Sequence, residues 1–155
     1  MNNPAKVVNQ NANAEIVSLL NQALADMLAL KINAKQAHWN VKAPNFLTLH
    51  ELFDQVATEA DGFADTIAER AVQLGGEAEG TIAHLSKRAA ATNHPQGKDA
   101  AKHLEAVISS MSAILEQARA GIETADKHGD AVTADILTQV AGGLDKLYWF
   151  VTSHQ

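Results

Sequence analysis

The sequence contains no cysteine. This absence excludes a disulfide framework, thiol nucleophiles, cysteine zinc sites and iron–sulfur clusters, so any bound metal must take nitrogen and oxygen ligands. With 155 residues, 46% of them hydrophobic, the chain is about the size of one ordinary domain and can bury a substantial core without cross-links. We therefore expect a single domain.

Long apolar runs are also absent. No stretch is long and apolar enough to cross a membrane, and the opening MNNPAKVVNQNANAE is polar where a secretory signal would be apolar. We expect a soluble cytoplasmic protein without a membrane partner, and the lack of cysteine fits a reducing compartment. The formal net charge of −6 argues against the broad cationic surface of a typical nucleic-acid binder.

Helical periodicity is what the sequence does contain. Apolar residues recur at three- and four-residue steps almost throughout, which is typical of amphipathic helices. Pro44 ends the first helix, the second runs from about Phe46 to Leu74, and the third runs from about Asp99 to Lys127. Asp130 can cap a fourth. The first stripe is Ile16, Leu19, Leu20, Ala23, Met27, Leu30 and Ala34, and the last is Ile136, Val140, Leu144, Leu147 and Val151.

The order of these helices predicts an all-α fold, a ferritin-like four-helix bundle. The links between the first pair and the last pair are short, whereas residues 77–98 form one long crossover that contains a short helix. Residues 1–14 are predicted to be a flexible tail and residues 15–153 the bundle domain. The glycine pair Gly142-Gly143 inside the fourth helix indicates close helix packing or a local bend.

Three potential metal ligands fall on helix faces where apolar residues are usual. His38 follows Ala34 by four residues on the buried stripe, and His50 lies equally far beyond Pro44, so the two lie side by side in an antiparallel helix pair. Asp54 is one turn after His50 on the same face. Each residue has an ordinary alternative role, as a hydrogen-bonded core histidine or a solvated carboxylate, but together they predict a nitrogen and oxygen donor cluster.

A second ligand pair, Asp65 and Glu69, follows on the same helix stripe. Fifteen residues separate His50 from Asp65, which is roughly 22 Å along a helix and too far for one metal ion. A second copy running antiparallel across a two-fold axis would bring His50 and Asp54 of one chain to Asp65 and Glu69 of the other. Surface salt bridging is the alternative for these two carboxylates. Mixed histidine and carboxylate ligands suit iron, manganese or zinc.

The stretches AHWNVKAPNFLTLHELFDQV and DTIAERAVQLGG, followed by TADIL and LDKLYWFV, resemble the Dps family of miniferritins from about residue 15 to 153. The resemblance implies a hollow homododecamer that oxidises Fe(II) at intersubunit centres, usually with hydrogen peroxide although dioxygen is an alternative oxidant, and stores the ferric mineral. Two iron ions per centre are implied, with zinc or manganese as substitutes. The implied ligands are His38, His50 and Asp54 of one chain with Asp65 and Glu69 of its partner.

The resemblance also implies roles for three other residues. Trp39 matches a tryptophan beside the iron centre, although ordinary core or interface packing is slightly favoured over a redox role. Asp130 and Asp135 fall where the family lines its iron-entry pores, and Asp130 has the alternative of a helix cap.

Two other functions remain open from the sequence. One is DNA compaction, an activity that the family often adds through a lysine-rich tail. Lys6 is the only lysine or arginine in residues 1–14, so DNA binding is expected to be weak or absent at neutral pH. Association with the nucleoid would require such binding. The other is divalent-metal binding without turnover. The remaining histidines, His84, His94, His103, His128 and His154, are expected to be solvated surface residues.

Overall fold

The computed structural model describes residues 10–91 and 93–155. It contains the helices α1 (Gln10–Asn40), α2 (Phe46–Gln73), α3 (Ile82–Arg88), α4 (Ala100–Lys127) and α5 (Ala131–Thr152), with no strand among these described residues. Residues 1–9 of the predicted tail lie outside the described residues, and the first helix begins at Gln10. The all-α bundle with one long crossover is confirmed.

Local signals explain where the helices end. The Ala43-Pro44-Asn45 turn separates α1 from α2 because proline lacks the N–H and disfavours helix in the preceding residue. Gly75 and Gly129 adopt φ values of +85° and +72°, a left-handed conformation that only glycine adopts without strain. Asp130 accepts a hydrogen bond from the backbone N–H of Thr133 at 3.0 Å and so caps α5.

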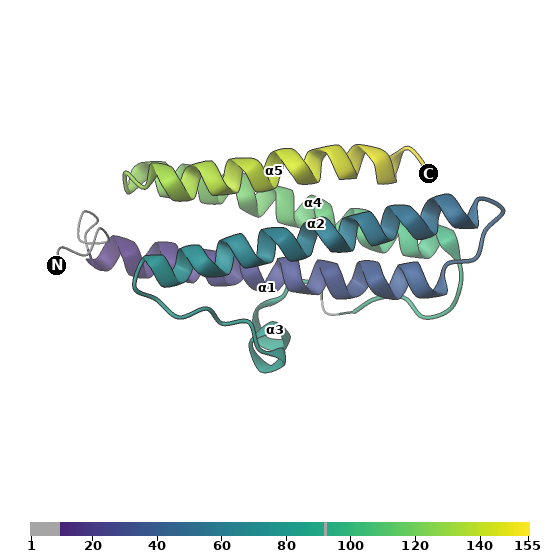
Figure 1. Cartoon of the computed structure of the whole chain (residues 1–155), viewed down its shortest axis with the longest axis horizontal. Coiled ribbons are helices and arrows are strands. Elements are labelled where there is room, and N and C mark those ends of the chain that lie inside the picture. The colour runs from purple at the N-terminus through teal and green to yellow at the C-terminus, as the bar shows by residue number, and fades with distance from the viewer. Residues whose placement is uncertain (1–9, 92) are drawn as a thin grey trace.

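The helices form two antiparallel hairpins that pack together. Figure 1 shows α1 beside α2 and α4 beside α5, with α3 projecting from the side of α1. The core lies between the hairpins, because the apolar stripes of all four long helices are buried there. The last stripe begins one residue later than predicted, since Leu137 is fully buried and Ile136 only partly.

The predicted glycine pair has a packing role at one of its two positions. A Cβ atom built on Gly143 would lie 2.5 Å from Cζ of Phe63, so the absent side chain lets α5 approach α2. Among the residues that the structure describes, a Cβ on Gly142 would meet nothing within 4 Å. Close packing is therefore the reason for Gly143, whereas Gly142 makes no comparable contact in one chain.

Polar side chains of α1 hold the long crossover against the bundle. Asn21 donates to the carbonyl of Glu77 and accepts from the N–H of Glu79, both at 2.9 Å. Asp26 accepts from the N–H of Ala90 at 2.9 Å, although its side chain is almost fully buried. Asn33 donates to the carbonyl of Ala91 at 2.9 Å. Because buried backbone groups need partners, these side chains fix the path of a segment that has little regular structure.

Candidate metal site

The predicted histidine pair is present at the end of the α1–α2 hairpin. The rings of His38 and His50 stack with centroids 3.7 Å apart and an angle of 18° between their planes. Nδ1 of His38 lies 2.7 Å from the carbonyl oxygen of His50, and Nδ1 of His50 lies 2.8 Å from the carbonyl oxygen of His38. Positions equidistant from Pro44 therefore do lie side by side, as the spacing predicts.

These reciprocal hydrogen bonds set the tautomer of both rings. A carbonyl oxygen can only accept, so each Nδ1 carries a proton and donates it. A ring that donates through Nδ1 keeps Nε2 for another partner, and a ring fixed in this way through its other nitrogen is the usual arrangement of a metal-binding histidine. Both side chains are only partly buried, so a metal ion can reach them from outside the bundle.

Asp54 is close to the histidines but is held by another group. Its Oδ1 lies 2.7 Å from Nζ of Lys35, and the side chains are 49% and 29% exposed respectively. The hydrogen bond from Lys35 lowers the pKa of Asp54 below its ordinary value, and the nearby lysine charge acts in the same direction. Asp54 is therefore a carboxylate at neutral pH, with an ammonium group as its partner.

Asp65 and Glu69 lie exposed farther along α2. The helical rise of about 1.5 Å per residue places Asp65 roughly 22 Å from His50 along the axis. Across residues 10–91 and 93–155, no three histidine, aspartate or glutamate side chains stand close enough together to hold a metal ion. One chain thus brings together His38, His50 and, beside them, Asp54, and does not bring Asp65 or Glu69 to that place.

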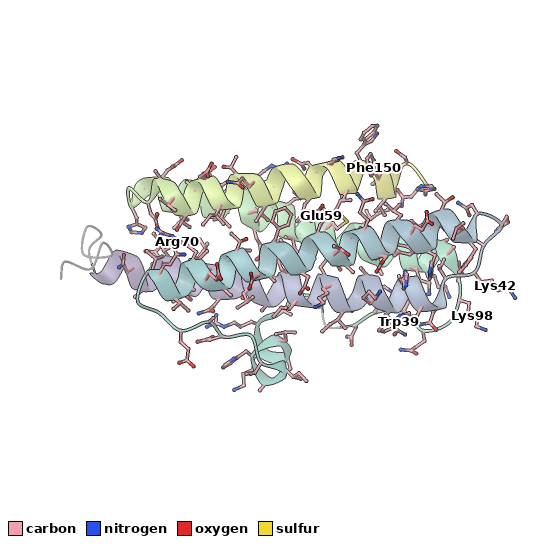
Figure 2. The ribbon with its side chains drawn as sticks, viewed as in Figure 1. Trp39, Lys42, Glu59, Arg70, Lys98 and Phe150 are labelled. Atoms are coloured by element: carbon pink, nitrogen blue, oxygen red, sulfur yellow. The ribbon has the colours of Figure 1, made fainter. Side chains whose placement is uncertain are left out.

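Trp39 lies next to the histidine pair on the surface. Its side chain is 66% exposed, so it does not pack in the core of the chain. Nζ of Lys35 lies 5.7 Å from the centroid of its ring, within the range of a cation–π contact. Figure 2 shows Trp39 near the α1–α2 turn and Arg70 toward the opposite end of the bundle.

The two predicted pore residues have different environments. Asp130 is buried, accepting from Arg70 at 2.7 Å and from the Thr133 hydroxyl at 2.6 Å. Burial would raise the pKa of Asp130, but the hydrogen bonds from Thr133 and the charge of Arg70 outweigh it, so the pKa is lowered. Asp130 is therefore a cap and ion-pair partner in this chain. Asp135 is exposed and accepts from Gln139 at 2.7 Å.

Two features of the site region were missed or misplaced by the sequence reading. The expectation that His103 is a solvated surface residue is wrong, since it is 1% exposed. Its Nε2 donates to the carbonyl of Gly97 at 3.0 Å, so its Nδ1 accepts from Nε2 of His94 at 2.8 Å. Burial, together with the nearby His103, lowers the pKa of His94 to about 4.

The other missed residue is Lys35, which lies opposite Asp54 across the turn.

Comparisons with known proteins agree with the fold. A family model for the ferritin-like domain matches residues 17–155. The DNA protection during starvation protein of Agrobacterium fabrum is 40% identical over 147 residues, which cover 93% of this chain and 90% of that protein. The protein of the same name from Brevibacillus brevis is 34% identical over 136 residues, covering 88% of this chain and 91% of that one.

Solved structures give the same result. The crystal structure of a Dps protein from Bacillus brevis matches with a TM-score of 0.88 and 32% identity, covering 93% of this chain and 97% of that one. Dps from Microbacterium arborescens in its high iron form matches with a TM-score of 0.86 and 33% identity, covering 92% and 93%. The chain thus belongs to the ferritin-like proteins and, among them, to the Dps family.

Proposed function

We propose that this protein is a ferroxidase that stores its product. It oxidises Fe(II) to Fe(III), preferentially with hydrogen peroxide, and keeps the ferric mineral inside a hollow shell of twelve copies. The observation that carries the proposal is the pair of stacked histidines whose Nδ1 atoms are both committed to carbonyl groups, which leaves both Nε2 atoms for iron. The high iron form of the related Microbacterium arborescens protein supports iron as the metal.

A second copy would complete each iron site. Asp65 and Glu69 would add two carboxylate ligands to His38, His50 and Asp54. They lie too far along α2 to reach these residues within one chain, so they would come from the second copy. Large apolar side chains near the histidine pair support a protein contact there, because they are exposed in the single chain. They are Ile32 (56% exposed), Trp39 (66%), Phe46 (42%) and Leu47 (61%).

The proposed reaction balances with iron as the substrate. Two ferrous ions each give one electron, and one hydrogen peroxide molecule accepts both, breaks its O–O bond and takes up two protons to form two water molecules. The chain binds and positions the ions through its imidazole and carboxylate groups. Because the sequence has no cysteine, the peroxide meets no thiol to oxidise. Pairing two ferrous ions avoids the one-electron route to hydroxyl radical.

The test is a pair of ligand variants. His50→Ala and Asp65→Ala should each slow peroxide-dependent iron oxidation strongly, by at least about ten-fold, because each removes a metal ligand. Stopped-flow absorbance of the ferric product measures the rate, and light scattering checks that the particle keeps its size. Glu59→Ala is the control, since Glu59 is another exposed carboxylate on α2 (Figure 2). Normal rates in both ligand variants would place the iron site elsewhere.

Mixing the two variants tests whether the site is shared. A pair of one His50→Ala chain and one Asp65→Ala chain has one site with both defects and one intact site. Random reassembly should therefore restore about one quarter of the sites, since half of the pairs are mixed. If both residues served a site within one chain, mixing would restore no activity.

DNA protection is the second candidate function. It is favoured by the name shared by the relatives from Agrobacterium fabrum and Brevibacillus brevis. Iron oxidation without free radical would also protect DNA, so the name does not require direct binding. Direct DNA binding would need a positively charged surface, whereas protection through iron oxidation would not, so the charge of the chain distinguishes the two routes.

A further inference from the structure

Lys35 forms an ion pair with Asp54, the carboxylate that the proposed iron site takes from the same chain as the two histidines. Its ammonium lies 2.7 Å from Oδ1 of Asp54, in a hairpin position directly beside the histidine pair. A lysine on α1 and an aspartate on α2 form a similar ion pair about one turn away along α1 and two turns away along α2, where Nζ of Lys31 lies 2.7 Å from Oδ1 of Asp61. The two ion pairs have comparable exposure, so they differ chiefly in their distance from His38 and His50.

A metal ion and an ammonium group compete for one carboxylate. A divalent ion bound by Nε2 of the histidines and by Asp54 would carry its charge into the space near Nζ of Lys35. Like charges at that separation repel, so a metal ion on Asp54 would weaken the contact of Lys35 with Oδ1 and favour displacement of the lysine. We propose that Lys35 is a built-in competing cation that holds Asp54 in the metal-free protein and lowers the affinity of the site for divalent metal. This inference rests on the proposed iron site.

The chain provides a place for the displaced ammonium. Trp39 follows Lys35 by four residues and therefore lies on the same face of α1. Nζ is already 5.7 Å from the centroid of the indole ring, and a modest rotation of the flexible lysine side chain moves it from Asp54 toward the ring face. Trp39 is thus both an alternative partner for the lysine and a local reporter of its position.

The same cation would stabilise the metal-free pair of chains. In a shared site, Asp54 would face Asp65 and Glu69 of the second copy, giving three carboxylates with no metal to offset them. Lys35 neutralises one of the three charges. Its removal should therefore have opposite effects on two properties: the metal-free assembly loses stability, whereas the affinity for metal rises.

The experiment titrates the assembled protein with Zn²⁺ alone, which accepts nitrogen and oxygen ligands and has no redox chemistry. The variants are Lys35→Met, which removes the charge, Lys35→Arg, which keeps it, and Lys31→Met, the matched control. All carry Trp149→Phe, so that Trp39 is the only tryptophan and its fluorescence reports the site. Thermal unfolding of each variant is measured with and without Zn²⁺.

Lys35→Met should bind Zn²⁺ about three- to ten-fold more tightly than the parent. The substitution removes the ion pair with Asp54 and also the repulsion between the lysine ammonium and the bound metal ion. Its metal-free form should unfold at a lower temperature, and its zinc-bound form should equal the parent. Lys35→Arg should bind Zn²⁺ no more tightly than the parent, because arginine holds carboxylates at least as well. Lys31→Met should leave the dissociation constant unchanged.

Equal dissociation constants for Lys35→Met and the parent would overturn the inference, as would an equal gain in Lys31→Met. A His50→Ala variant separates this failure from failure of the iron site itself. If His50→Ala loses zinc binding while Lys35→Met matches the parent, the site stands and only the role of Lys35 is wrong. If His50→Ala binds Zn²⁺ normally with the same Trp39 response, the proposed site is wrong as well.

Discussion

His38 and His50 orient each other through hydrogen bonds to the main chain, and the ring of Phe46 packs beside His50. Each ring donates to the main chain of the opposite helix, so the main-chain positions on both sides of the turn fix both imidazoles. Metal sites usually rely on carboxylates or carbonyls in the second layer to hold their histidines. Here the α1–α2 hairpin supplies that layer, so both proposed ligands are oriented before any metal binds.

His94 gives a prediction for pH dependence. Its pKa is about 4 in the folded protein against an ordinary value of 6.5, so between these values the unfolded chain binds more protons. The contribution of His94 to the free energy of unfolding should be fully present above about pH 6.5 and should be lost as the pH falls toward 4. Because the side chain is partly exposed, the loss should be on the order of 1–2 kcal/mol. Urea unfolding at several pH values measures this decline.

The variant for this prediction is His94→Gln. Its amide can still donate to Nδ1 of His103 but does not titrate, so part of the decline between pH 6.5 and 4 should disappear. His154→Gln, near the C-terminus, is the control and should keep the parental profile. A decline of unchanged size in His94→Gln would show that other groups cause it.

Single residues were predictable where spacing alone placed them. The distance of His38 and His50 from Pro44 fixed their pairing, and Asp54 follows from its helix turn. Lys35 carried the same signal, since it lies nearly as far before Pro44 as Asp54 lies after it, but a lysine among helical polar residues resembles any solvated charge. His103 could not be recognised, because its partners at residues 94 and 97 lie in an irregular segment.

At the scale of the helix, the two adjacent glycines of α5 should respond differently to the same substitution. Gly142→Ala should stabilise the protein by up to about 1 kcal/mol, because alanine favours helix and its Cβ meets no neighbour in the described part of the chain. Gly143→Ala should destabilise it by about 1–3 kcal/mol, because its Cβ would displace the ring of Phe63. Denaturant unfolding compares the two variants.

A double variant serves as the control for this prediction. Phe63→Leu shortens the side chain that Gly143→Ala would displace, so the combined change should cost less than the sum of the two single changes. Strict additivity would mean that the contact between α5 and α2 does not limit the substitution. A loss in Gly142→Ala equal to that in Gly143→Ala would point to a contact between copies.

Helix ends and crossover differ in how well the sequence predicts them. Pro44, Gly75 and Gly129 act on their immediate neighbours, and the predicted boundaries agree with the structure within a few residues. The path of the crossover depends on hydrogen bonds from Asn21, Asp26 and other α1 residues to main-chain groups far along the chain. Spacing within one segment carries no signal for such contacts.

For the whole molecule, charge predicts weak DNA binding. Each chain carries −6, so the proposed shell of twelve copies would carry a formal charge of −72 and would repel a duplex at long range. The described cations include Lys42 and Lys98 at the end of the bundle near the α1–α2 turn (Figure 2), but Lys31, Lys35 and other cations are held in ion pairs. We expect no plasmid retardation by the purified assembly at neutral pH and moderate salt.

Two variants locate any binding that does occur. Lys6→Ala alters the tail, and Lys42→Ala with Lys98→Ala alters the end of the bundle. Tight retardation by the native protein would contradict the expectation, and its loss in one of these variants would identify the contact. Lowering the pH makes the assembly less negative, so retardation that appears only there agrees with the charge argument.

The hydrogen bonds that fix the crossover also imply an order of folding. They join residues 56 to 66 positions apart, whereas α1 and α2 are joined by a tight turn. Closing a long loop costs more chain entropy than closing a short one, and the N-terminal part of a chain leaves the ribosome first. The first hairpin can therefore form while α4 and α5 are still being synthesised. Its tip carries both histidines, so each newly made chain can shape its half of the proposed iron site before its bundle is complete.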